Sequence, residues 1–171
     1  MIDFLGKTFY SFNFLSYLTV LIILFLNNSE AQWNQQNSGT NYDLNGVSFY
    51  DSLYGWVVGK NGIILHTTDG ENNWFLQSST IRGSIRGVSF CDTMNGWAAG
   101  DEGIVLVTSN GGENWKGIVT NNFNSSKDLI MLGDTGYVVQ LAGKIFQTTD
   151  GGYTWNQQSS GENSINDIDF V

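Results

Sequence analysis

The sequence predicts an all-β fold made of repeated four-stranded antiparallel units, and three observations support this prediction. The chain of 171 residues has 21 Gly, no Pro and 14% aromatic residues, a composition that suits short strands joined by tight turns. Residues 46–78 align with residues 87–119 at a shift of 41, with identity at 15 of 33 positions. A third copy runs over residues 129–158, in which residues 136–158 repeat the second half of this unit. Such a period is typical of a β-propeller, whose blades are stacked four-stranded sheets.

Each copy of the repeat divides into four short apolar runs separated by Gly, Asn or Asp, as expected for the four strands of one blade. The third run, for example Ile63-Ile64-Leu65, is apolar without alternation, so both of its faces must be covered. Stacked blades provide this cover. A repeat of about 41 residues is also longer than the 20–29 residues of a leucine-rich repeat. We expect complete blades at residues 46–79, 87–120 and 128–159.

The two ends of the repeat region carry parts of further repeats. Residues 33–36 read Trp-Asn-Gln-Gln, as do residues 155–158, so we expect a single outer strand at residues 33–37. Residues 168–170 resemble the start of a blade, so we expect a single inner strand at residues 166–171. About three complete blades are fewer than the four to eight of a closed propeller. We therefore expect residues 32–171 to be a partial β-propeller and a fragment of a larger one.

The first 31 residues have the features of a signal peptide. A weakly basic start precedes the apolar residues 14–26, and small residues stand before a cleavage site between Ala31 and Gln32. The apolar stretch is shorter than the roughly 20 residues that a membrane-spanning helix needs. We therefore expect an exported protein that does not span a membrane after cleavage. Its expected location is periplasmic or extracellular, or the thylakoid lumen in a photosynthetic host.

Composition excludes several classes of partner and site. The formal net charge of -9 argues against nucleic-acid binding, which requires a basic surface. The single Cys91 and the single His66 supply neither a disulfide nor a metal-ligand cluster, and we interpret both as strand or core residues. We expect no catalytic residues, no metal and no cofactor.

The turn between the third and fourth strands carries a recurring motif that resembles the Asp-box, S/T-x-D-x-G-x-T-W, of sialidases and other bacterial-neuraminidase-repeat propellers. Only the third copy has every motif residue. Acidic or amide side chains suit hydrogen bonds to the turn's own backbone, and the Trp can pack beneath the hairpin, so we interpret the motif as structural. The motif residues are Thr67, Asp69, Trp74, Thr108, Asn110, Gly112, Trp115, Thr148, Asp150, Gly152 and Trp155.

The whole unit, GVSFxDxxxGWxxGxxGxIxxTTDGGxxW, is similar to the repeat of the photosystem II assembly and stability factor family. The resemblance covers nearly all of residues 32–171. It implies a β-propeller that acts without catalysis as a protein-binding scaffold and holds an assembling membrane protein complex. The expected partner is therefore a protein.

The alternating direction of the four strands in each blade predicts at which end of the blades such a partner binds. With four antiparallel strands per blade, the Asp-box turns lie at one end, and the blade crossovers lie at the other end. Loops presented by a rigid scaffold commonly carry function. Both arginines of the chain fall in one crossover, and arginine is enriched at binding hot spots. The candidate partner-binding residues are Arg82, Arg86, Lys60, Asp101, Glu102 and Phe123.

Two enzyme classes share the Asp-box. A sialidase needs a cluster of arginines from successive blades, which two arginines in one loop do not supply. An exported carbohydrate-active propeller, either a glycan-binding protein or an inverting glycoside hydrolase with two carboxylates about 6.5–9.5 Å apart, stays open as an alternative. The available crossover carboxylates are Asp43, Asp101, Glu102 and Asp128.

Overall fold

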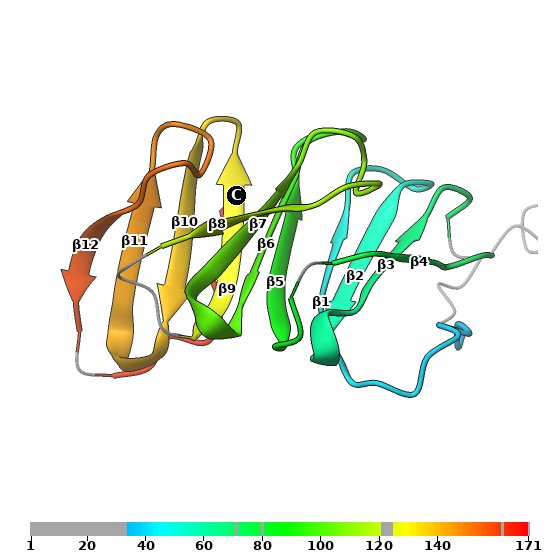
Figure 1. Ribbon diagram of the computed structural model, residues 1–171, viewed down its shortest axis with the longest axis horizontal. Coiled ribbons are helices and arrows are strands. Elements are labelled where there is room, and N and C mark those ends of the chain that lie inside the picture. The colour runs from blue at the N-terminus through cyan, green and yellow to red at the C-terminus, as the bar shows by residue number, and fades with distance from the viewer. Residues whose placement is uncertain (1–33, 71, 80, 121–124, 162, 171) are drawn as a thin grey trace, which may run out of the picture. The chain divides into compact units, whose positions relative to one another are not determined.

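The computed structural model describes residues 34–70, 72–79, 81–120, 125–161 and 163–170, which form three four-stranded antiparallel sheets (Figure 1). The first blade has strands β1 (Leu44–Phe49), β2 (Gly55–Gly59), β3 (Ile64–Thr67) and β4 (Phe75–Gln77). The second blade has β5 (Ile85–Phe90), β6 (Gly96–Gly100), β7 (Ile104–Thr108) and β8 (Lys116–Val119). The third blade has β9 (Ser126–Leu132), β10 (Thr135–Gln140), β11 (Lys144–Thr148) and β12 (Asn156–Ser160). The predicted all-β fold of antiparallel four-stranded units is confirmed.

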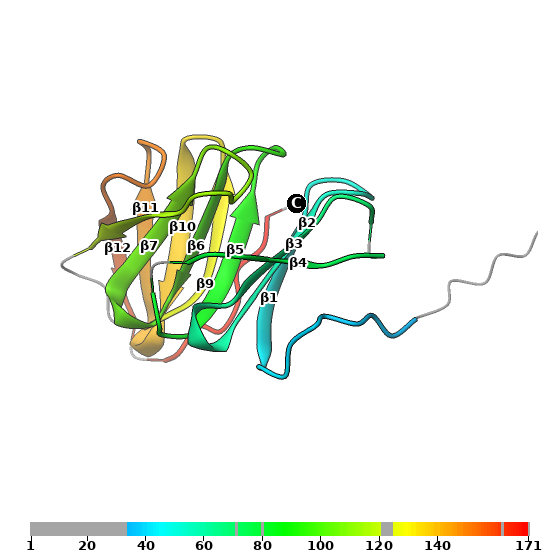
Figure 2. The same cartoon turned by 45° about the vertical axis from the view of Figure 1, so that its right-hand side comes forward.

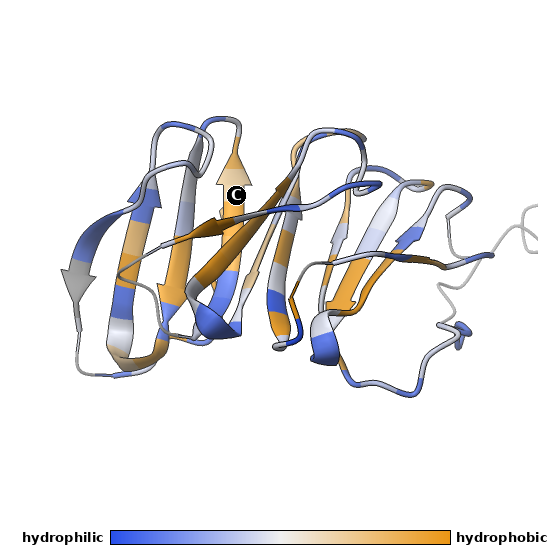
Figure 3. Ribbon diagram, viewed as in Figure 1, coloured by the Kyte–Doolittle hydropathy of each residue, from blue (hydrophilic) through white to orange (hydrophobic). Residues whose placement is uncertain are grey.

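Strands pair in chain order within each blade, so every blade is a meander of hairpins. The first hairpin of the first blade is fixed by Asp51, whose Oδ1 accepts the N–H groups of Leu53 and Tyr54 at 2.7 and 2.8 Å. Asp92 does the same in the second blade. An Asp that bonds the backbone two residues ahead is a common turn-forming device. Figure 3 shows the resulting pattern, with apolar residues concentrated on the strands and polar residues on many of the turns.

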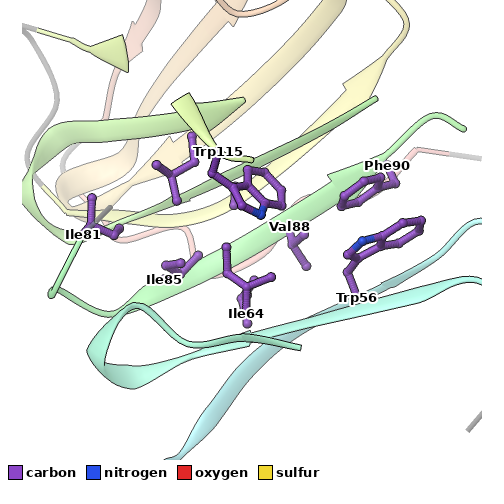
Figure 4. Close-up of a cluster of buried hydrophobic side chains, with 10 residues drawn as sticks. Trp56, Ile64, Ile81, Ile85, Val88, Phe90 and Trp115 are labelled. Atoms are coloured by element: carbon purple, nitrogen blue, oxygen red, sulfur yellow. The ribbon is translucent and has the colours of Figure 1, made fainter. Parts of the chain in front are cut away.

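The blades stack through apolar side chains, and their first strands lie side by side, β1 beside β5 and β5 beside β9 (Figures 1 and 2). Trp56 of the first blade stacks on Phe90 of the second, with ring centroids 3.5 Å apart and planes 6° apart. Trp115 meets the same Phe90 edge-on at 5.8 Å (Figure 4). Buried aromatic groups of this size contribute strongly to packing energy.

The second blade packs on the third in the same way. Trp97 occupies the position of Trp56 and is buried in a cluster with Leu129, Met131 and Trp155. The two clusters share no residue, so each interface between blades has its own core. This is the arrangement that an uninterrupted apolar third strand predicts, since both faces of the middle sheet are covered.

The two single strands expected at the ends do not form in the described residues. Residues 34–37 and 166–170 are not part of any strand, because a strand forms only where a neighbouring strand completes its ladder of hydrogen bonds. The C-terminal segment nevertheless lies against the third blade. The N–H of Ile168 bonds Asp128 Oδ2 at 3.2 Å, and the ring of Phe170 lies 5.1 Å from that of Tyr137. The predicted signal peptide and its cleavage site at Ala31 and Gln32 lie outside the described residues.

Candidate functional site: the crossover rim

We define the crossover rim as the end of the blades that carries the turns between second and third strands together with the connections between blades. The first such turn is the short 3-10 helix η1 (Lys60–Gly62), in which Gly62 donates its N–H to the carbonyl of Gly83 at 2.8 Å. The second is η2 (Asp101–Gly103), in which Asp101 donates to Ser84 at 2.9 Å. These bonds hold the turns of two blades against one crossover, and the predicted grouping of turns and crossover at one end is confirmed.

The turns of the rim share a backbone conformation that explains their sequence. The middle residue of each turn is left-handed, with φ of 57° at Asn61, 70° at Glu102 and 60° at Ala142 in η3 (Leu141–Gly143). At Gly62, φ is 69°, and an added Cβ would lie 2.1 Å from the carbonyl oxygen of Ile81. Only glycine fits both the conformation and the close approach, so the turn is fixed in place.

The opposite end carries the turns between third and fourth strands, which we call the box turns, at residues 67–74, 108–115 and 148–155. Each box turn is bonded to the first hairpin of its own blade, for example through the N–H of Gly151 to the carbonyl of Asp134 at 2.9 Å. The box turns and the crossover rim therefore lie at opposite ends of the strands, as the alternating direction of the four strands predicts.

Each box turn satisfies the side-chain oxygen of its own Asp or Asn residue. Asp150 Oδ1 accepts the hydroxyl of Thr148 at 2.8 Å and the N–H of Thr154 at 2.9 Å, while its Oδ2 accepts the Thr154 hydroxyl at 2.6 Å. Asn110 accepts the equivalent pair from Thr108 and Asn114. The side-chain and backbone hydrogen bonds from Thr154 hold the pKa of Asp150 below its ordinary value. A carboxylate held ionised by its own turn is a structural group, not a poised acid.

The first box turn keeps this geometry. Asp69 accepts the Thr67 hydroxyl at 2.9 Å, and it also accepts the backbone and side-chain N–H groups of Asn73 at 3.0 and 2.7 Å. The side-chain hydrogen bond from Asn73 is the main cause of the lowered pKa of Asp69. Trp74 is half-buried, whereas Trp115 and Trp155 of the other box turns are buried between blades.

The box turns also join neighbouring blades. The indole N–H of Trp56 bonds the carbonyl of Gly111 at 3.0 Å, and that of Trp97 bonds Gly151 at 2.7 Å. Each tryptophan thus reaches from the second strand of one blade to the box turn of the next. At Gly152, φ is 88°, and an added Cβ would lie 3.1 Å from the indole of Trp97. These bonds between blades were not predicted, and the recurring Gly-Trp pair was the only signal for them.

At the crossover rim, the two arginines differ. Arg86 Nε bonds Asp101 Oδ1 at 3.2 Å, and the same oxygen accepts the Ser125 hydroxyl at 3.0 Å. Burial opposes ionisation of Asp101, but the hydrogen bonds from Arg86 and Ser125 outweigh it and lower its pKa. Arg82 is exposed and forms no ion pair with any described residue. The sequence predicted both arginines in one crossover loop, but Arg86 lies in β5, so that part of the prediction is wrong. The sequence also did not reveal that Arg86 is already paired with Asp101.

The other predicted rim residues lie as follows. Lys60 is exposed and pairs with Asp43 of the preceding segment. The carboxylate of Glu102 lies beside the crossover, since a Cβ added to Gly83 would be 3.0 Å from its Oε1. Phe123 lies outside the described residues. The structure therefore brings Arg86 and Asp101 together and places Glu102 close to them.

A polar hollow opens beside the inner strands and was not predicted as a site. It has a volume of about 350 Å³, and its charged lining residues are Arg86, Lys127, Asp128 and Asp167. Burial, together with the neighbouring Asp167 carboxyl, raises the pKa of Asp128 to about 6. Sequence reasoning named Asp128 only as an available carboxylate, because its partner Asp167 is 39 positions further along the chain.

His66 lies in β3 and is half-buried. Its ring stacks on Trp56 with centroids 4.6 Å apart, and burial lowers its pKa, so it behaves as a neutral packing residue as expected. Cys91 is exposed, so the interpretation of this residue as part of the core is wrong. It directly follows β5, where the strand leaves the interface between blades.

Two further classes of site are not found in the part of the chain that the structure describes. No group of three or more His, Cys, Asp or Glu side chains there could hold a metal ion. Among the same residues, no helix is long and apolar enough to cross a membrane.

Comparison with known proteins places the chain in a family. The family model described as photosynthesis system II assembly factor YCF48 matches residues 26–132, more than half of the chain. The solved structure "YCF48 bound to D1 peptide" has a TM-score of 0.67 and 27% identity, covering 75% of this chain and 45% of that one. YCF48 from Cyanidioschyzon merolae has a TM-score of 0.64 and 27% identity, covering 74% and 40%. The chain thus spans less than half of these solved relatives.

A third structure shows the fold alone. An ancestral GH74 enzyme aligns with a TM-score of 0.59 at 21% identity, covering 75% of this chain and 20% of that one. Among curated proteins, none matches the chain. The family match and the blade architecture agree with each other, and the chain belongs to the photosynthesis system II assembly factor YCF48 family.

Proposed function

We propose that the chain is an exported, non-catalytic scaffold that binds a peptide segment of an assembling membrane protein complex. The observation that carries this proposal is its similarity to YCF48, a protein solved with a bound D1 peptide. A rigid stack of blades that presents loops at one rim suits such a role, because ordered loops lose little conformational entropy on binding.

The partner binds at the crossover rim, where Arg82 is the main contact. Its guanidinium is exposed and has no ion-pair partner among the described residues, so it is available for a bidentate bond to a carboxylate of the partner. Arg86 is held by Asp101 and shapes the site. Glu102 and Lys60 flank this contact and select the partner by charge.

The absence of catalysis in this proposal follows from the chemistry of the box turns, which we interpret as Asp-boxes. The carboxylate oxygens of Asp69 and Asp150 accept hydrogen bonds from their own turns, and the uncharged side chain of Asn110 does the same in the second blade. The second blade thus supports a structural role for the motif, in which the turn needs an acceptor and not an acid.

Export is a separate part of the proposal. The N-terminal 31 residues direct the chain out of the cytoplasm and are removed between Ala31 and Gln32. Expression in the native host followed by mass spectrometry of the purified protein tests this, and we expect a mature chain that starts at Gln32. An N-terminus that still begins at Met1 would contradict export by cleavage.

The binding function is tested by capture from membranes of the native host. The chain carrying both Arg82→Ala and Arg86→Ala should capture less of its partner than the unmodified chain, with a nearly unchanged thermal midpoint. Lys116→Ala removes a cation from β8, an exposed position beside the second box turn, and serves as the control that should capture normally. Equal capture by the double variant and the unmodified chain would refute the rim as the binding site.

A carbohydrate-active function is the second candidate, and the polar hollow favours it. The raised pKa of Asp128 beside Asp167 is the kind of environment that keeps a general acid protonated near neutral pH. The test is hydrolysis of β-glucans by the chain and by Asp128→Asn. Hydrolysis that Asp128→Asn abolishes would establish this alternative, and no turnover by either protein would leave the scaffold as the function.

A further inference from the structure

A second hollow lies at the box-turn end of the molecule, between the second and third blades. Its volume is about 340 Å³, and we call it the box hollow. Buried Trp97 of β6 and half-buried Val107 of β7 line it, together with Tyr153 of the third box turn, which is 65% exposed. Both blades around it are complete four-stranded sheets. A hollow of this size suits a small molecule, because ligand pockets begin at about 300 Å³.

The first junction between blades shows how the chain itself fills the equivalent place. There the ring of His66 stacks on Trp56, with centroids 4.6 Å apart and planes 7° apart. The ring of Tyr54 lies 6.4 Å from that of His66. Phe90 also stacks on Trp56 (Figure 4). The tryptophan of the first blade is therefore surrounded by planar rings of its own chain.

Non-aromatic residues stand at the equivalent positions around Trp97. They are Asn95 for Tyr54, Val107 for His66 and Met131 for Phe90. Val107 lies opposite Trp97 in the pairing of β6 with β7, as His66 lies opposite Trp56 in the first blade. A planar group bound in the box hollow would supply the second junction with the ring that His66 supplies in the first.

The charges that line the box hollow are negative. Asp134 and Asp150 contribute carboxylates, and none of the described lining residues is a lysine or an arginine. The hydrogen bonds from Thr154 lower the pKa of Asp150, which keeps this carboxylate ionised. Burial is the main cause of the raised pKa of Cys91, another lining residue, and the charges of Asp92 and Asp134 add to it. The box hollow therefore favours a cation.

We propose that the box hollow binds a small molecule that carries a planar guanidinium group, placed beside Trp97 and Tyr153 with its N–H groups directed at Asp134. A guanidinium combines the planar shape of the His66 ring with a positive charge, and it stacks on aromatic rings as well as bonding carboxylates. A simple ammonium lacks the planar shape, and a neutral planar molecule lacks the charge. This site goes beyond the proposed peptide binding, since it lies at the end of the strands opposite the crossover rim.

A titration followed by nuclear magnetic resonance tests the proposal, with the indole N–H signal of Trp97 as the reporter. This signal is identified by its loss in Trp97→Phe. We expect methylguanidinium to move it in a saturable way. N-methylurea has nearly the same shape without the charge, and methylammonium has the charge without the planar group, so both should bind more weakly.

Variants of the lining residues locate the site. Asp134→Asn and Tyr153→Ala should each weaken binding of methylguanidinium by about three- to fivefold, the size expected for an exposed ion pair or cation–π contact. Val107→His introduces the imidazole that the first blade has and should abolish binding. Glu113→Gln is the matched control, because it removes one exposed negative charge at the position of Tyr153 in the second box turn and should leave binding unchanged. Circular dichroism confirms that each variant is folded.

Three outcomes would overturn the proposal. They are the absence of a saturable shift with methylguanidinium, equal binding of N-methylurea, and an affinity of Asp134→Asn equal to that of the unmodified chain or of Glu113→Gln. The result is independent of peptide binding at the crossover rim, because these substitutions leave Arg82 in place. An Asp134→Asn variant that binds methylguanidinium weakly and still captures the partner would separate the two sites.

Discussion

The two ends of the blades use charged side chains in opposite ways. At the box turns, Asp69 and Asp150 are satisfied within a few residues of themselves, and the carbonyl of Gly151, next to Asp150, accepts the indole N–H of Trp97 from the adjacent blade. At the crossover rim, the charged residues come from segments far apart in the chain, and Arg82 remains exposed without an ion pair to the described residues. The first end stabilises the fold, and the second end carries the exposed charge on which the proposed binding site rests.

This difference shows how one repeat can serve two purposes. A motif that satisfies itself locally can recur in every blade, because the bond that it makes to a neighbouring blade needs only one donor, the indole N–H of a tryptophan. A binding site needs residues that are not repeated, and the two arginines of the chain are Arg82, in the crossover, and Arg86, near the start of β5. Substitutions at the box turns should therefore change stability, and substitutions at the rim should change binding.

The largest effect is expected at the junction of two blades. Trp97→Ala removes a buried indole and should lower the free energy of unfolding by about 3–5 kcal/mol. Trp97→Phe retains most of the ring but leaves the carbonyl of Gly151 without its donor, which should cost about 1–3 kcal/mol. Urea unfolding followed by circular dichroism measures both. A cost below that of an ordinary surface substitution would show that the blades do not depend on this contact.

A smaller effect is expected within a box turn. Asp150→Ala removes the acceptor of three hydrogen bonds and should lower the free energy of unfolding by about 1 kcal/mol. Asp150→Asn should be close to neutral, because Asn110 already performs this function in the second blade. The same urea experiment measures both variants. If Asp150→Asn abolished binding or turnover without loss of stability, the structural interpretation of the turn would be wrong.

The next effect depends on pH and concerns the hollow beside the inner strands. The pKa of Asp128 is raised from an ordinary value of 3.8 to about 6 in the folded chain, so folding takes up a proton between these values. Ionised Asp128 therefore destabilises the folded chain, and this effect decreases as Asp128 is protonated between about pH 7 and about pH 5. Asp128→Asn should raise the thermal midpoint at about pH 7, and this advantage should shrink at about pH 5.

Comparing the two proteins at each pH isolates Asp128 from the other charged residues nearby. Asp167, Lys127 and Arg86 line the same hollow and are present in both proteins. The box aspartates have lowered pKa values, so they lose their stabilising contribution only at lower pH. An advantage of Asp128→Asn that stays constant across this range would show that Asp128 titrates at its ordinary value.

The smallest effect on stability is expected at the rim. Arg82→Ala should change the free energy of unfolding by less than about 0.5 kcal/mol, because the side chain is exposed and unpaired among the described residues. Arg86→Ala breaks a half-exposed ion pair with Asp101 and should cost no more than about 1 kcal/mol. If Arg82→Ala lowered the free energy of unfolding by more than about 1 kcal/mol, Arg82 would contribute to the stability of the fold, in contrast to the role proposed here.

The repeat was enough to predict the blades, because the four apolar runs and the glycine turns recur at a fixed spacing. The box turns were predicted for the same reason, since their hydrogen bonds join residues two to four positions apart. The ion pair of Arg86 with Asp101 and the contact of Asp128 with Asp167 join different parts of the chain, and no local pattern marks them. The end segments were predicted as strands from their sequence, but a strand forms only where a neighbouring strand pairs with it, and a local sequence pattern does not reveal such pairing.

The central claim is that the crossover rim, and not the box end, binds a peptide. Fluorescence anisotropy with the labelled D1 peptide measures this directly for the unmodified chain, for Arg82→Ala and for Lys116→Ala. We expect Arg82→Ala to weaken binding by about tenfold or more and Lys116→Ala to leave it unchanged. Unchanged affinity of Arg82→Ala, or an equal loss in both variants, would contradict the claim.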